Sequence, residues 1–157
     1  MKDWRFVGDT YICDLRVAGV LIKNGKILVQ RDRHGNEYAI PGGHVKVGEI
    51  MTESLIREFK EETGAEITCE RLLWSEECFW ENSGRKVHNV SFYYLISFSP
   101  DFDIPDHGQF IPQKDNDSVL LGWIPIKEIE QLTIYPEFIK QTIHQLDAPR
   151  AHFITRA

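Results

Sequence analysis

The most informative stretch of the chain runs from Gly43 to Ala65 and reads GHVKVGEIMTESLIREFKEETGA. Within it, Thr52 to Thr63 contains good helix formers and no glycine or proline, and Gly64 supplies a C-terminal stop. We therefore expect a helix over this segment. Its apolar side would face a sheet and is formed by Leu55, Ile56 and Phe59.

Three glutamates, Glu58, Glu61 and Glu62, stand at positions i, i+3 and i+4 of this helix and share one face. Like charges placed in this way repel one another unless a positive charge lies among them. Hard divalent cations prefer carboxylate oxygens, and Mg²⁺ characteristically joins one or two carboxylates to substrate phosphates. The alternative is a solvated acidic face partly compensated by Arg57 and Lys60, and the triplet alone favours that interpretation.

The complete pattern resembles the signature of the Nudix hydrolase family. This resemblance favours a metal site over a solvated acidic face. Its seven fixed positions are all matched, by Gly43, Glu49, Arg57, Glu58, Glu61, Glu62 and Gly64. The preceding Tyr38-Ala-Ile-Pro-Gly-Gly also resembles the aromatic, aliphatic and Pro-Gly-Gly run that leads into the family motif. Ala65 departs from the pattern, which prefers a larger aliphatic residue there, but that position makes a packing contact.

The resemblance implies a role for each matching residue. Glu58, Glu61 and Glu62 would hold Mg²⁺, with Mn²⁺ as an alternative ion, and the backbone carbonyl of Gly42 is a further expected ligand. Glycines there allow the main chain to approach an ion closely. The residues expected to have a structural role are Gly43, Glu49, Arg57 and Gly64, and among them Arg57 and Glu49 resemble the family's ion pair between helix and loop.

The reaction implied by the resemblance is hydrolysis of a phosphoanhydride. Divalent ions that bridge a pyrophosphate neutralise developing charge and lower the pKa of a bound water, whose proton a carboxylate then takes. Glu58 is the candidate base within the motif. Asp115 and Asp117 are candidates from a loop, and Asp117 precedes the strand that ends at Gly122-Trp123, where related enzymes often place an extra acidic ligand. The alternative for both aspartates is a polar turn.

Candidate substrate contacts lie outside the helix. Arg31 and Arg33 follow the expected second strand and could hold phosphates, although they could equally serve the solubility of a loop. His44 lies in the motif loop and is a candidate for touching substrate. Aromatic residues that could stack on a base, but that more often belong to a core, are Phe79, Trp80, Tyr93 and Trp123.

The flanking segments predict an α/β domain. Asn24-Gly25 separates two apolar runs, Arg16–Ile22 and Lys26–Gln30, and tolerates the positive φ angles of a tight turn between antiparallel strands. The other expected elements are strands at Val90–Phe98 and Val119–Ile126, a polar loop at Asp101–Asp117, a helical turn near Lys127–Gln131, and a last helix from Pro136 with Phe138, Ile139, Ile143 and Leu146 inward. Together with the resemblance, this order predicts an α/β/α sandwich with a mixed central β-sheet.

Bulk composition limits the classes of function. The chain has 157 residues, which predicts a single domain over residues 1–157. A net charge of −6 disfavours a nucleic acid polymer as partner. There is no apolar run long enough to span a bilayer and no signal-peptide pattern, so we expect no membrane association and a cytoplasmic location. The three cysteines are expected to be reduced.

Three functions fit the motif. The first is a pyrophosphohydrolase acting on a nucleoside diphosphate linked to another moiety, such as an ADP-sugar. The alternative is an enzyme that converts a nucleoside triphosphate, oxidised or not, to the monophosphate and pyrophosphate. A Nudix-like ligand-sensing domain without activity fits less well, because such domains usually lose motif acids and none is missing here. The strand and aromatic content also permits a homodimer.

Overall fold

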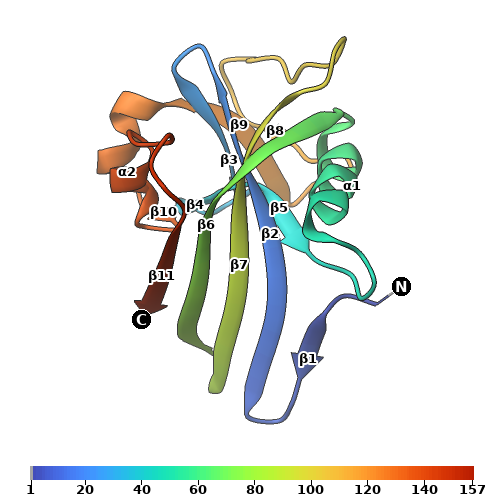
Figure 1. The fold of residues 1–157 in the computed structure, drawn as a ribbon, viewed down its shortest axis with the longest axis vertical. Coiled ribbons are helices and arrows are strands. Elements are labelled where there is room, and N and C mark those ends of the chain that lie inside the picture. Colours follow the sequence, from blue (N-terminus) through green and yellow to red (C-terminus); the bar gives the residue numbers. More distant parts are fainter. Residues whose placement is uncertain (1) are drawn as a thin grey trace.

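The computed structural model describes residues 2–157, and a large mixed β-sheet forms its centre (Figure 1). The main order of strands across the sheet is β10-β4-β3-β2-β7-β6-β11. The strands are β1 (Arg5–Val7), β2 (Tyr11–Lys23), β3 (Lys26–Asp32), β4 (Tyr38–Ala39), β5 (Gly42–His44), β6 (Ile67–Asn82), β7 (Arg85–Phe98), β8 (Ile111–Pro112), β9 (Val119–Pro125), β10 (Ile134–Tyr135) and β11 (Ala151–Arg156). The helices are α1 (Met51–Thr63), α2 (Ile139–Thr142) and the 3₁₀ helix η1 (Ile126–Gln131).

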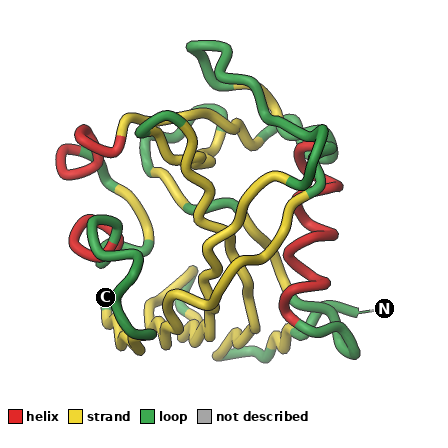
Figure 2. Tube along the Cα trace, turned by 45° about the horizontal axis from the view of Figure 1, so that its top comes forward, coloured by secondary structure: helices red, strands yellow, loops and turns green. Residues whose placement is uncertain are grey.

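The sheet contains both parallel and antiparallel strand pairs. β2 runs parallel to β7, β6 to β11, and β4 to β10, whereas β2–β3, β6–β7 and β3–β9 are antiparallel. Helices lie on both faces, with α1 on one side and α2 with η1 on the other (Figure 2). The predicted mixed α/β architecture is therefore confirmed.

The two faces of the sheet carry separate halves of the core. On one face, Leu55 and Phe59 of α1 pack with Val17 and Leu21 of β2. The other half of the core joins β2 to η1 and α2 and includes Ala18, Val20, Ile129, Ile139 and Ile143. Because successive strand residues point to opposite faces, β2 supplies side chains to both halves. Ile56 was expected inward with Leu55, but it is 39% exposed because it lies at the edge of the apolar stripe.

The hairpin predicted at Asn24-Gly25 is confirmed. Ile22 pairs with Ile27 and Lys23 with Lys26 across the turn. Asn24 and Gly25 have φ angles of 51° and 72°, the left-handed conformation that a two-residue hairpin turn requires.

The strand prediction was incomplete in the middle of the chain. It began one strand at Val90, but β7 begins at Arg85 and forms a long hairpin with β6, which was not predicted. The charged residues of β6 obscure its pattern, and one of them, Glu76, is buried. Glu76 is tolerated inside because the hydroxyls of Tyr93 and Thr155 donate hydrogen bonds to it, at 3.0 and 2.7 Å.

The C-terminal region also differs from the prediction. The expected long helix from Pro136 is reduced to α2, although Ile139 and Ile143 are buried as expected. Pro136 instead follows β10, which pairs in parallel with β4, and the chain then returns as β11 beside β6. Pairing with distant strands decides these segments, which a local helical pattern cannot reveal. In residues 2–157, no helix has the length and apolarity required to cross a membrane.

Candidate active site

Arg57 of α1 binds Glu49 through two parallel hydrogen bonds. The Nε–Oε1 distance is 2.8 Å and the Nη2–Oε2 distance is 2.9 Å. Ser54 also donates its hydroxyl to Glu49 at 2.5 Å. The hydrogen bonds from Arg57 are the largest cause of a pKa of about 2 for Glu49, well below its ordinary 4.5. This contact fixes α1 against the loop that precedes it, as expected for a structural pair.

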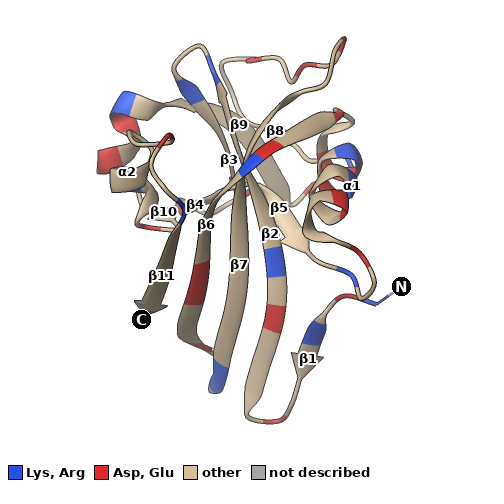
Figure 3. Cartoon of the chain, in the orientation of Figure 1, with Lys and Arg blue, Asp and Glu red and all other residues tan. Residues whose placement is uncertain are grey.

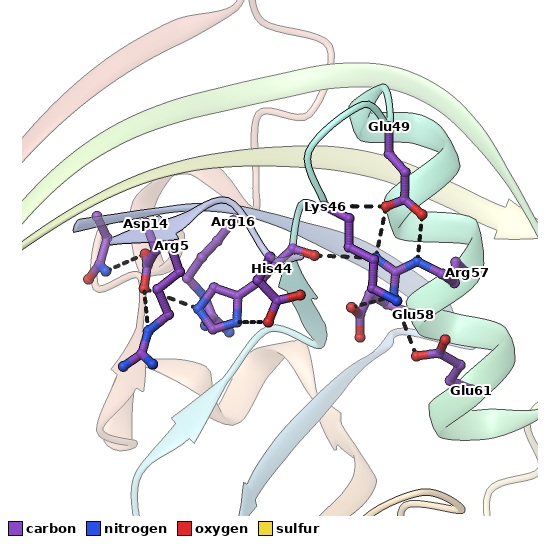
Figure 4. A network of polar contacts seen from close by, with 11 residues as sticks. Arg5, Asp14, Arg16, His44, Lys46, Glu49, Arg57, Glu58 and Glu61 are labelled. Atoms are coloured by element: carbon purple, nitrogen blue, oxygen red, sulfur yellow. Dashed lines mark hydrogen bonds and ion pairs between the residues drawn. The ribbon is translucent and has the colours of Figure 1, made fainter. Parts of the chain in front are cut away.

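The same guanidinium reaches two of the motif glutamates. Arg57 Nη1 donates to Glu58 Oε1 at 2.8 Å and to Glu61 Oε2 at 3.4 Å, and Nη2 donates to the carbonyl of His44 at 3.3 Å (Figure 4). The side chain of Arg57 therefore connects the loop before α1 with the acidic face of α1.

Two glycines let the chain pass close to Glu58. β5 pairs with β2 so that Gly43 lies opposite Val17. A Cβ at Gly43 would overlap the carboxylate of Glu58, and one at Gly42 would overlap the carbonyl oxygen of Val17. No other residue type fits at either position without displacing main chain or the carboxylate.

Glu62 is a buried carboxylate that lacks a neutralising contact. Only 7% of the surface of Glu62 is exposed, and its Oε2 has no hydrogen-bond partner among residues 2–157. Burial is the main cause that raises its pKa to about 8, and the negative charges of Glu58 and Asp115 add to the effect. Burial also raises the pKa of Glu58, despite its hydrogen bond from Arg57. Buried charges of this kind are normally paired with a cation.

The donor set fits a hard divalent cation. Glu58, Glu61 and Glu62 offer carboxylate oxygens, and the site lacks the thiolates or clustered imidazoles that softer ions prefer. Within the described part of the chain, no three His, Cys, Asp or Glu side chains already converge on one point. Glu58 and Glu61 each accept a hydrogen bond from Arg57 through one carboxylate oxygen, so the second oxygen of each can bind a cation.

The two loop aspartates occupy different surroundings. The loop packs against the end of α1, where Lys114 N donates to the carbonyl of Glu62 at 2.8 Å. Asp115 is close enough for its charge to raise the pKa of both Glu58 and Glu62. Both aspartates are exposed, and the carbonyl of Asp117 accepts hydrogen bonds from Nε and Nη2 of Arg33 at 3.0 and 2.5 Å. Asp115 thus lies within electrostatic range of the glutamates, whereas the carbonyl of Asp117 anchors Arg33.

Arg31 and Arg33 both bind main-chain oxygens. Arg31 Nη1 donates to the carbonyls of Asp32 and Arg33 at 3.1 Å, and its guanidinium lies 5.0 Å from the ring centre of Phe110. These contacts brace the turn after β3. They do not join the arginines to the acidic cluster, so phosphate binding by either one stays a prediction.

Sequence reasoning missed Arg16 and Asp14 on β2. Arg16 lies opposite His44 of β5, and its positive charge partly offsets the burial and the negative charges that raise the pKa of Glu62. Figure 3 shows a basic and an acidic position one after the other along β2, and in the sequence Asp14 and Arg16 are separated by one residue. Two charges at alternate positions of an otherwise apolar strand were a signal of a polar patch on one face of the sheet.

Comparison with known proteins places the site in context. A family model described as the NUDIX domain matches residues 14–146. A Mycobacterium tuberculosis protein that carries the name MutT4 is 28% identical over 68% of this chain and 40% of its own length. The ADP-ribose pyrophosphatase of Methanocaldococcus jannaschii is 41% identical over 31% of this chain and 30% of its own length. The chain therefore spans less than half the length of these two relatives.

The fold also matches solved structures. The MutT protein of Bacillus halodurans superposes with a TM-score of 0.63 at 17% identity, covering 91% of this chain and 89% of that one. The ORF135 protein of E. coli gives a TM-score of 0.53 at 26% identity, covering 90% and 91%. The first likeness shows the fold alone, and it agrees with the mixed sheet and few helices described above.

Proposed function

Because this chain belongs to the Nudix family, we propose that it hydrolyses a phosphoanhydride bond in a nucleoside diphosphate linked to another moiety, such as an ADP-sugar. The observation that carries the proposal is the buried Oε2 of Glu62, which has no hydrogen-bond partner among residues 2–157 and lies on the same helix as Glu58, the glutamate packed against Gly43. The similarity to an ADP-ribose pyrophosphatase supports this class of substrate.

We propose Mg²⁺ as the cofactor, with Mn²⁺ as an alternative. Glu58, Glu61, Glu62 and the carbonyl of Gly42 would hold it. When bound, the ion supplies positive charge that offsets the phosphates and lowers the pKa of a coordinated water. The unpartnered Oε2 of Glu62 supports this assignment, because a cation would supply the contact that the protein itself does not.

The chain's own residues orient the reaction and accept the proton. Glu58 is the proposed base, since Arg57 holds Oε1 and the two lone pairs of Oε2 allow it both to bind the cation and to accept a proton. Asp115 is the second candidate because it lies within electrostatic range of the same glutamates, and Asp117 remains a candidate extra ligand. Glu49 keeps Arg57 in place. Arg31, Arg33 and His44 are the proposed substrate contacts.

The alternative substrate is a nucleoside triphosphate cleaved to the monophosphate and pyrophosphate. The match to the MutT4 protein, which covers 68% of this chain, is the observation in its favour. The complete set of motif acids argues against a non-catalytic sensing domain. A small nucleotide-like substrate, a cytoplasmic location and a homodimer stay predictions.

A substrate panel with matched variants tests the proposal. ADP-ribose, other ADP-sugars and the nucleoside triphosphates are incubated with Mg²⁺ or Mn²⁺, and released monophosphate and pyrophosphate are quantified. We expect Glu58→Gln and Glu62→Gln each to lose at least about 100-fold of the turnover seen with the best substrate. Glu130→Gln, at an exposed position on η1, is the control and should keep wild-type turnover.

Circular dichroism should show that all variants remain folded. If Glu58→Gln and Glu62→Gln both hydrolyse the substrate at the wild-type rate, the assignment of the site is wrong. If no phosphoanhydride is cleaved by the wild-type protein with either ion, the proposed function itself is wrong.

A further inference from the structure

A second polar pocket lies beside the glutamate site, on the other face of the sheet from α1. Its volume is about 280 Å³, and Asp14, Arg16, His44, Trp80 and Asn89 contribute to its walls. Val17 of β2 packs toward α1, so its neighbours at alternate positions point to the opposite face. Register places these residues together, because Arg16 lies opposite His44 and Asp14 opposite Asn89.

Asp14 is held in this pocket as an ionised carboxylate. Its side chain is 7% exposed. Asn89 Nδ2 donates to Oδ1 at 2.5 Å, and His44 Nε2 lies 3.1 Å from Oδ2. Burial alone would raise the pKa of Asp14, but these hydrogen bonds and the charges of His44 and Arg16 outweigh it and lower the pKa. The carboxylate therefore stays charged at neutral pH.

The same contacts leave acceptor capacity unused. A carboxylate accepts about four hydrogen bonds, and Asn89 and His44 occupy about two of these positions. A further ligand must therefore bring hydrogen-bond donors to Asp14. A phosphate placed directly against Asp14 would be repelled by its charge, although Arg5, whose Nε lies 4.0 Å from Oδ2, and Arg16 also line the pocket.

The walls around Asp14 are fixed in orientation. Trp80 Nε1 donates to Asn89 Oδ1 at 2.7 Å, which directs the amide nitrogen of Asn89 toward Asp14. Trp80 keeps 41% of its surface exposed, and the neighbouring Ile12 and Val87 add apolar surface to the pocket. The far part of the pocket can therefore cover a flat, apolar group.

His44 links the pocket to the glutamate site (Figure 4). His44 belongs to both, since its carbonyl accepts from Arg57 Nη2 and its ring lies near Asp14 and Arg16. Along β2, Arg16, Asp14 and Ile12 follow one another on the same face at steps of about 6.6 Å. From the glutamates outward, the face therefore presents the positive charge of Arg16, then the hydrogen-bond-accepting carboxylate of Asp14, and then the apolar surface of Ile12.

We propose that this pocket binds the ribonucleoside half of the substrate, with Asp14 accepting hydrogen bonds from the ribose 2′- and 3′-hydroxyls. Arg16 then faces the phosphates, and the base rests against Trp80. The inference rests on the proposed function, because phosphates at the glutamates are what would place a ribose at Asp14. Recognition of the ribose hydroxyls by Asp14 would make the protein selective for ribonucleotides over 2′-deoxyribonucleotides. Such selectivity favours an ADP-sugar over a deoxynucleoside triphosphate as substrate.

Binding of a non-hydrolysable pair tests the proposal. The affinities of α,β-methylene-ADP and its 2′-deoxy counterpart are measured by calorimetry in Mg²⁺. We expect the wild-type protein to prefer the ribonucleotide by about tenfold or more, because a site built for a hydroxyl is left with an unpaired buried group without it. In Asp14→Asn the preference should fall to within about twofold. Asp147→Asn, at an exposed position, is the control and should keep the wild-type ratio.

The ratio separates recognition from a merely structural role of Asp14. A structural role would weaken both analogues equally and lower thermal stability without changing their ratio. Trp80→Ala should weaken both analogues about equally, and unchanged affinity would overturn the placement of the base. Equal binding of both analogues by the wild-type protein would overturn the proposal without any need for a variant, and an unchanged ratio in folded Asp14→Asn would overturn it as well. The proposed function is tested separately. If the protein hydrolyses a phosphoanhydride and this activity depends on Glu58, the proposed function holds even when the ribose proposal is overturned.

Discussion

The Cα of Gly43 lies directly against the carboxylate of Glu58, where a Cβ would overlap its carboxyl carbon and both oxygens. Gly43 is fixed by pairing of β5 with β2, and Glu58 by its place on α1 and its hydrogen bond from Arg57. A sheet and a helix thus meet at the proposed metal site with no space for one methyl group.

Gly43→Ala should therefore displace Glu58 rather than the sheet. We expect turnover to fall by about 100-fold, because a misplaced catalytic group costs that much, while the fold is retained. Steady-state kinetics with the best phosphoanhydride substrate measure the effect. Gly35→Ala is the control, since a Cβ there would meet nothing closer than 3.3 Å. Normal turnover in Gly43→Ala would contradict the assigned position of Glu58.

Arg57→Lys keeps the positive charge but removes the fork that binds both oxygens of Glu49. We expect kcat to fall at least about tenfold, and the free energy of unfolding to fall by about 1–3 kcal/mol because a partly buried carboxylate loses hydrogen bonds. Kinetics and urea unfolding measure the two effects. Arg150→Lys, at an exposed position, should be neutral in both. If Arg57→Lys behaves like that control, charge alone is sufficient at residue 57.

Acid should remove the stabilisation that Glu49 provides. Its folded-state pKa of about 2 is below the ordinary value of 4.5, so the contribution is complete above about pH 4.5. It is lost as the pH falls from there toward 2. Urea unfolding at several pH values should show the wild-type protein losing its advantage over Glu49→Gln across this window. A constant difference between the two proteins would show that Glu49 does not titrate in this way.

Glu62→Gln should stabilise the metal-free protein at alkaline pH. A carboxyl whose folded-state pKa is about 8 instead of 4.5 makes folding less favourable as the pH rises through that interval. In EDTA at pH 8 we expect a higher Tm for Glu62→Gln than for wild type, and no difference at pH 4.5. Addition of Mg²⁺ should raise the Tm of the wild-type protein more than that of the variant. A lower Tm of the variant in EDTA at pH 8 would refute this.

Asp115→Asn and Asp117→Asn should separate the two loop acids. Asp115 lies within electrostatic range of Glu58 and Glu62, whereas the carbonyl of Asp117 anchors Arg33 and would persist in the variant. We expect kcat to fall by at least about tenfold in Asp115→Asn and to change little in Asp117→Asn. The opposite result would make Asp117 the functional acid and would imply that the loop moves when substrate binds.

Features that depend on neighbours along the chain were already determined by the sequence. The helix α1, its stop at Gly64 and the Asn24-Gly25 turn follow from helix propensity and from the few residues that adopt positive φ. The shared face of the three glutamates was likewise predictable from helix geometry, whereas the Arg57–Glu49 pair was predicted from the resemblance to the Nudix motif.

Only the tertiary structure decided which distant groups meet. Asp14 is 30 residues from His44 and 75 from Asn89 along the chain, and strand register alone brings the three together. Glu76 and the strand β6 escaped prediction because a charged residue suggests a surface until Tyr93 and Thr155 are seen to bind it. Hydrogen bonds across a sheet depend on how strands pair, and that pairing is decided by the whole core rather than by any local pattern.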